Sequence, residues 1–179
     1  MAADSEQELQ WVSAVLSIQQ LAARYALAVD SRDLTMLASL FVPDVQVGRN
    51  RSGRDALQSW YADALSSVGA TIHLLANHSV EVEGDVARGV VYCREEVQLL
   101  NSEEWRIGML QYWDDYRKVD GNWLFQRRQV RRWYTHLDST SEERETSLPD
   151  NDKGPREQSL PEAFPTWSSF YANNKSIPS

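Results

Sequence analysis

The chain has 179 residues, of which 42% are hydrophobic and 25% charged, and its formal net charge is −8. This length favours one domain with a sizeable core, and the negative charge argues against nucleic acid as a partner, because phosphate binding needs a positive field. The single cysteine, Cys93, cannot form an internal disulfide. We find neither a signal sequence nor an apolar segment long enough to cross a bilayer, so we expect a cytoplasmic protein without a membrane partner.

The first part of the chain is predicted to be helical. Apolar residues recur at steps of four and three from Trp11 to Val29, which is the spacing of one helix face. Asp33 is suited to cap a second, short helix, and Pro43 stops it. Three helices are therefore expected, over Glu6–Val29, Leu34–Phe41 and Arg54–Val68.

From about Ala70 the apolar period becomes that of strands. The segments are rich in β-branched and aromatic residues, and Asp120 and Gly121 between two of them form a typical hairpin turn. Four strands are expected, over Ile72–Glu83, Asp85–Leu100, Trp105–Val119 and Asn122–Tyr134. Helices followed by antiparallel strands predict an α+β fold in which the helices cover one face of a curved sheet.

The last forty or so residues differ in composition, so we divide the chain into a folded domain, 1–137, and an arm, 138–179. Asp138–Gln158 is rich in Ser, Glu, Asp and Pro, which predicts a flexible tether. Leu160–Tyr171 brings back large aromatic side chains. We expect this aromatic segment to pack on the domain, on a neighbouring subunit or over the mouth of a pocket, because soluble proteins rarely expose such a patch.

Asp30, at the end of the first helix, and His73, on the first strand, can form a buried Asp–His pair. In such a pair the carboxylate fixes the tautomer of the imidazole and raises its basicity, which makes a general base. The bland alternative is that Asp30 caps a turn and His73 is an ordinary core histidine. Strand alternation places Asn77 on the face of His73 and His78 on the other face, so His78 is expected to be structural. No third ligand lies at zinc-like spacing, so no metal is expected.

The chain resembles the SnoaL-like branch of the nuclear-transport-factor-2-like superfamily over residues 16–134. The resemblance rests on four stretches, namely Tyr25–Asp33, Leu40–Asp44, Thr71–His73 with Asn77, and Tyr116–Phe125. It implies a cone, in which a bent sheet wraps around the first helix and encloses an apolar pocket. Dehydratase and dehydrochlorinase members, such as scytalone dehydratase, bile-acid 7α-dehydratase and lindane dehydrochlorinase, use an aspartate and a histidine that match Asp30 and His73. They carry no metal and no organic cofactor.

The resemblance also suggests residues that contact a substrate. Tyr25 matches a pocket tyrosine or lysine, although a place in the apolar stripe of its helix is equally consistent. Arg127, which shares strand parity with Phe125, matches a basic residue that binds a leaving group or an oxyanion, and Tyr112 matches a polar position. Where scytalone dehydratase has a second histidine this chain has Val97, so the resemblance supplies no general acid at this position. Glu95, of the same parity, is the candidate. Cys93 has no neighbouring base, so we expect it to pack in the core.

These observations predict a cofactor-independent lyase or isomerase that acts on a small apolar, polycyclic molecule, such as a steroid. The alternative is a non-catalytic binding or scaffold subunit with the same fold, because this fold also serves proteins without chemistry. We also expect a homo-oligomer, either a dimer or a trimer.

Overall fold

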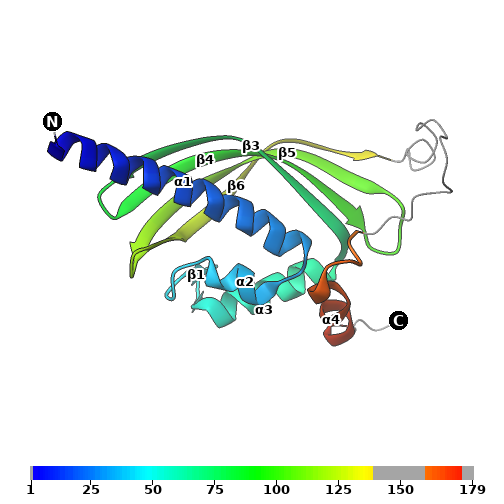
Figure 1. Cartoon of the computed structure of the whole chain (residues 1–179). Coiled ribbons are helices and arrows are strands. Elements are labelled where there is room, and N and C mark those ends of the chain that lie inside the picture. Colours follow the sequence, from blue (N-terminus) through cyan, green and yellow to red (C-terminus); the bar gives the residue numbers. More distant parts are fainter. Residues whose placement is uncertain (1, 139–159, 175–179) are drawn as a thin grey trace, which may run out of the picture.

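The computed structural model describes residues 2–138 and 160–174, with side chains from residue 5 (Figure 1). The predicted tether, Asp138–Gln158, therefore lies almost wholly outside the described residues. The elements in chain order are α1 (Ala2–Asp30), α2 (Leu34–Ser39), β1 (Gln46–Val47), β2 (Arg51–Ser52), α3 (Arg54–Ser66), β3 (Val68–Glu83), β4 (Val86–Leu99), β5 (Trp105–Val119), β6 (Asn122–Asp138) and α4 (Pro165–Asn173).

The main sheet is an antiparallel meander with the order β3-β4-β5-β6, and β1 and β2 form a separate small hairpin. Asp120 and Gly121 both have positive φ, 49° and 79°, as the tight turn between β5 and β6 requires. The sheet is strongly curved, and α1 lies along its concave side, with α2 and α3 next to the C-terminal half of α1 (Figure 1). The predicted α+β fold is confirmed.

The core lies between α1 and the concave face of the sheet. Ile18, Ala22 and Val29 of α1 are buried on the helix face that the periodicity predicted. They belong to one apolar cluster with inward-facing side chains of β4, β5 and β6, including Val91, Cys93, Leu110, Tyr112 and Phe125. Helix α2 begins where expected, because the Asp33 side chain accepts a hydrogen bond from the Met36 amide at 2.8 Å.

Helix α1 is longer and more apolar than the sequence pattern predicted. Its segment Ser5–Asp30 is long and apolar enough to cross a membrane by length and composition alone, so the statement that no segment reaches this length is wrong. A core helix passes the same test, and the face of α1 that carries Ile18 and Ala22 is buried against the sheet. Packing explains the apolar character of this face only. Leu9, Leu16 and Leu27 are exposed, and so is Trp11, which the periodicity had placed on the buried face.

Two strands contain extra residues that change which side chains face the concave side. In β3, Leu75 pairs with Cys93 and His78 pairs with Val91, so β3 advances three residues while β4 advances two. In β6, Phe125 pairs with Tyr116 and Arg127 with Asp115, so Gln126 is the inserted residue. Such β-bulges reverse the inward and outward alternation beyond the insertion.

Candidate active site

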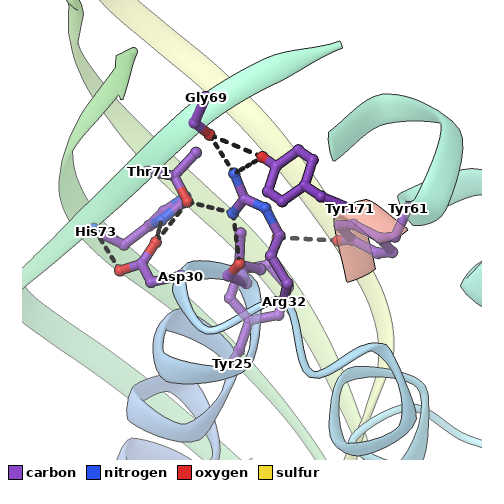
Figure 2. A network of polar contacts seen from close by, with 9 residues as sticks. Tyr25, Asp30, Arg32, Tyr61, Gly69, Thr71, His73 and Tyr171 are labelled. Carbon is purple, nitrogen blue, oxygen red and sulfur yellow. Dashed lines mark hydrogen bonds and ion pairs between the residues drawn. The ribbon is translucent and has the colours of Figure 1, made fainter. Parts of the chain in front are cut away.

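The end of α1 carries Asp30 against the start of β3, where it meets His73. Asp30 Oδ1 lies 2.7 Å from His73 Nδ1, and Oδ2 accepts the His73 backbone N–H at 2.9 Å. Thr71, two residues earlier on the same strand face, donates its hydroxyl to Asp30 Oδ1 at 2.9 Å. The two side chains are largely shielded, with 7% of His73 and 17% of Asp30 exposed. The predicted hydrogen-bonded Asp–His pair is therefore formed (Figure 2).

The partners of Asp30 determine the tautomer of His73. An ionised carboxylate only accepts hydrogen bonds, so the hydrogen of the neutral ring must be on Nδ1. The lone pair is then on Nε2, which is the atom that can take a proton from a substrate. The backbone and Thr71 contacts hold the carboxylate in place, so the ring orientation is set by three separate hydrogen bonds.

Arg32 supports this pair from the loop after α1. Its backbone has φ of +60°, an uncommon conformation for an arginine, and only 2% of the residue is exposed. Its Nη1 donates to the Val29 carbonyl at 2.7 Å and to Thr71 Oγ1 at 2.8 Å, and its Nη2 donates to the Gly69 carbonyl. Because Thr71 Oγ1 accepts from Arg32, its own hydrogen is directed to Asp30 (Figure 2).

An aromatic wall adjoins His73. The Tyr25 ring lies edge-on to the His73 ring, with 6.5 Å between centroids, and its hydroxyl is 2.9 Å from that of Tyr61 on α3. Tyr112 contacts the other side of Tyr25, with 5.7 Å between ring centroids. Burial raises the pKa of Tyr25, although the charge on Arg128 partly lowers it, and burial raises the pKa of Tyr61 and Tyr112 well above the ordinary value. These hydroxyls therefore keep their protons near neutral pH and can donate hydrogen bonds.

Arg128 is buried among rings of α1, β5 and β6, and sequence reasoning missed it. Its guanidinium carbon lies 4.1–4.2 Å from the ring centroids of Tyr25, Tyr112 and Phe125. Its Nε and Nη2 donate to the two carboxylate oxygens of Asp114 at 2.8 and 2.6 Å. Burial opposes the charge, but the interaction with Asp114 outweighs it and raises the pKa of Arg128. Nη1 is buried without a hydrogen-bond partner.

The parity argument for Arg127 is wrong. Because Gln126 is inserted, Arg127 is exposed, and Arg128 instead faces the concave side. Arg127 lies at the rim of a groove of 1110 Å³, which Val82, Ala87 and Tyr116 also line. No local feature of the sequence marks the position of the bulge, so Arg128 could not be chosen over its neighbour.

The same error affects Asn77 and His78. The bulge between Leu75 and His78 leaves Asn77 exposed and turns His78 toward the core, where His78 Nε2 lies 3.2 Å from the hydroxyl of Tyr116. That hydroxyl donates to Asp114 Oδ2 at 2.8 Å, so His78 Nε2 must carry the hydrogen for their contact. His78 therefore has the opposite tautomer to His73, and burial lowers its pKa.

Glu95 lies on the concave face directly across from His73 in the β3–β4 pairing, as its parity predicted. It accepts a hydrogen bond from Arg132 Nη1 at 2.6 Å. Space for it comes from Gly108, where a Cβ would lie 3.3 Å from Glu95 Cγ and Oε1. A role as proton donor would require this ion pair to open, so the tyrosine hydroxyls are better placed as donors.

Cys93 and Val97 are both buried on β4. Burial raises the pKa of the Cys93 thiol to about 12, so the expectation that Cys93 packs in the core is confirmed. Within residues 2–138 and 160–174, no three His, Cys, Asp or Glu side chains gather as a set of metal ligands.

The comparisons with known proteins concern the family and the fold of this chain. The sequence profile of the SnoaL-like domain matches residues 10–129, and an uncharacterised protein of Mycobacterium tuberculosis, Rv2910c, is 30% identical over 123 residues, covering 65% of this chain and 84% of the relative. The chain belongs to the SnoaL-like domain family. Its fold is that of the nuclear-transport-factor-2-like superfamily.

Solved structures of SnoaL-like and related proteins superpose on this chain. A scytalone dehydratase candidate from Novosphingobium aromaticivorans has a TM-score of 0.63 and 25% identity, covering 70% of this chain and 87% of its own. Rv3472 of Mycobacterium tuberculosis, of unknown function, has a TM-score of 0.59 and 32% identity, covering 70% and 74%. The hexachlorocyclohexane dehydrochlorinase LinA-type3 of Novosphingobium barchaimii has a TM-score of 0.66, covering 74% and 94%; at 21% identity this likeness concerns the fold alone.

Proposed function

We propose that this protein is a cofactor-independent lyase of the dehydratase type, in which His73 is the general base. The observation that carries the proposal is the 2.7 Å contact between Asp30 and His73 Nδ1, which leaves Nε2 as the basic atom beside an aromatic wall. The family assignment and the dehydratase-type neighbours support a lyase-type role.

In the proposed reaction, His73 Nε2 removes a proton from a substrate carbon. The electrons of the C–H bond form a carbon–carbon double bond, and the bond from the adjacent carbon to its leaving oxygen or halogen breaks. Asp30 holds the ring and stabilises the imidazolium that forms. In an isomerisation, the imidazolium would instead return the proton to another carbon of the substrate.

The leaving group needs a donor, and two kinds of donor adjoin Tyr25, whose ring contacts His73. The hydrogen-bonded hydroxyls of Tyr25 and Tyr61 keep their protons, and Arg128, in contact with the Tyr25 ring, has a buried Nη1 amino group without a partner. Developing negative charge on a leaving oxygen is stabilised by such preorganised donors. Both lie around Tyr25, so we place the leaving group on that side of His73.

For the substrate we propose a small apolar, polycyclic molecule, with a hydroxysteroid as the first choice. The support is the Tyr25 ring beside His73, with the rings of Tyr112 and Phe125 packed on Tyr25, together with the resemblance to bile-acid 7α-dehydratase. We further propose that the protein acts in the cytoplasm as a homo-oligomer.

The test is a panel of hydroxysteroids and terpenoid alcohols incubated with the purified full chain and analysed by mass spectrometry for loss of water. Conversion of at least one member without added metal or cofactor is expected. His136, which is exposed on β6, provides the matched control, because His78 lies in the Tyr116–Asp114 network. His136→Ala should convert the same substrate at the rate of the unaltered chain.

The alternative, a binding or scaffold subunit, is favoured by one observation. The side chain of Arg128, ion-paired with Asp114 and in contact with three rings, fills space between α1 and the sheet. Conversion of no panel member, together with copurification of a larger catalytic chain, would support this function and contradict the lyase.

A further inference from the structure

The C-terminal helix α4 contacts both chain segments that carry the Asp–His pair. Thr166 Oγ1 donates to the carbonyl of Ser31, one residue after Asp30, at 2.5 Å. Tyr171 donates its hydroxyl to the carbonyl of Val68, at the start of β3, at 2.8 Å. Helix α4 therefore joins the end of α1 to the beginning of β3, and it lies beside both in Figure 1.

Between these two contacts, α4 covers Arg32. The guanidinium carbon lies 4.7 Å from the ring centroid of Trp167 and 5.9 Å from that of Phe170, and Arg32 Nη2 is 3.4 Å from the Tyr171 hydroxyl. Phe170 is buried. Aromatic faces stabilise a desolvated cation, so Trp167 and Phe170 of α4 supply a favourable surface to the buried guanidinium.

Arg32 is in turn linked to the pair through one hydroxyl. Arg32 Nη1 donates to Thr71 Oγ1, Thr71 donates to Asp30 Oδ1, and Asp30 accepts from His73 Nδ1, at 2.8, 2.9 and 2.7 Å (Figure 2). Since a hydroxyl has one hydrogen, the Arg32 contact selects the direction in which Thr71 donates. These four residues form a chain of hydrogen bonds that we call the relay.

We propose that Arg32 is a positioning residue for the Asp30–His73 pair and that α4 acts as a clamp that holds Arg32 in the relay. When α4 is docked, Arg32 is fixed, Thr71 donates to Asp30, and the imidazole of His73 keeps its hydrogen on Nδ1. When the clamp is weakened, Arg32 and the Thr71 hydroxyl gain freedom, and the orientation of His73 is no longer enforced. This inference rests on the proposed function for its catalytic consequence, but the orientation of His73 can be measured without a substrate.

The test is NMR of the ring nitrogens and their hydrogens in the ¹⁵N-histidine-labelled full chain. His73 is expected as the Nδ1–H tautomer and His78 as the Nε2–H tautomer. The exposed His136 should show a mixture of the two tautomers. Trp167→Ala removes the ring over Arg32, and Thr71→Val removes the hydroxyl link while conserving shape. Both variants should lose the protected Nδ1–H signal of His73 and keep the Nε2–H signal of His78, which reports an intact core.

Ser168→Ala, on the exposed side of α4, is the matched control and should leave all three histidine signals unchanged. Tyr171→Phe is a milder change, to be used if Trp167→Ala unfolds the chain and the His78 signal is lost as well. It should weaken the His73 signal. Retention of the His73 Nδ1–H signal in both Thr71→Val and Tyr171→Phe would overturn the proposal.

The two proposals fail separately. With a substrate in hand, Trp167→Ala should lower kcat by up to about 10²-fold, the cost of a misplaced catalytic group, with little change in KM. If no substrate is turned over while the His73 signal responds as described, the proposal that α4 is a clamp is supported and the proposed lyase activity is contradicted. If turnover depends on His73 but the signal ignores α4, the clamp is wrong.

Discussion

The buried ion pair between Asp114 and Arg128 allows a quantitative test of the core. Asp114 is 0% and Arg128 4% exposed at the side chain. The Asp114 carboxylate accepts two hydrogen bonds from Arg128 and one from Tyr116. Asp114→Asn removes the negative charge while keeping the shape, so the charge of Arg128 stays buried without a counter-charge. Loss of one partner of a buried pair costs about 3–5 kcal/mol.

For a chain of this size, a loss of that magnitude lowers the Tm by roughly 6–20 °C, at about 2–4 °C per kcal/mol. The assay is urea unfolding followed by circular dichroism and tryptophan fluorescence. Adding Arg128→Met to Asp114→Asn removes the unpaired charge and should restore part of the lost stability, because a buried pair can be replaced by apolar groups at little cost.

Asp115 provides the matched control on the next position of the same strand. It lies 3.6 Å from Arg88, and the two side chains are 43% and 85% exposed. Asp115→Asn should change the free energy of unfolding by less than about 1 kcal/mol. The reasoning is refuted if Asp114→Asn is no more destabilising than Asp115→Asn, or if adding Arg128→Met lowers the stability further.

Two more predictions concern buried titratable groups. Burial lowers the pKa of His78 in the folded chain below its ordinary 6.5. As the pH falls, His78 is therefore protonated in the unfolded chain before it is protonated in the folded chain. The free energy of unfolding should fall as the pH drops from about 6.5 toward the folded pKa. In urea titrations between pH 7.5 and 5, His78→Gln should make the free energy of unfolding depend less on pH. An unchanged pH dependence would contradict the prediction. Cys93 is fully buried with a thiol pKa of about 12, so iodoacetamide at pH 8 should modify it only as the chain unfolds in urea; full labelling of the native protein would be the opposite result.

Most of the fold follows from local patterns. The spacing of apolar residues predicted three helices, and Asp33 and the Asp120-Gly121 turn marked element boundaries that the structure reproduces within a few residues. These features depend on short-range physics, namely helix periodicity, capping and turn conformation. The hairpin of β1 and β2 and helix α4 were not predicted as elements, because each is short and depends on packing rather than on a repeating pattern.

The candidate site was predictable only in part. Asp30 and His73 were chosen through the resemblance, and Thr71 shares the strand face of His73, so alternation could have included it. Arg127, Asn77 and His78 were misassigned, and Arg128 was missed, because one inserted residue reverses the alternation of a strand. The sequence does not mark where the insertion lies. Arg32 was missed because its role depends on a left-handed backbone and on α4, more than 130 residues away along the chain.

The central claim is that His73, oriented by Asp30, is the base of a cofactor-free elimination. The most direct measurement is the turnover of the converted panel substrate by His73→Ala and Asp30→Asn, in the presence of a metal chelator, with folding verified by circular dichroism. We expect His73→Ala to lose a factor on the order of 10² to 10⁴ in rate, and Asp30→Asn to lose nearly as much because the tautomer is no longer fixed. Turnover of His73→Ala close to that of His136→Ala would contradict the account.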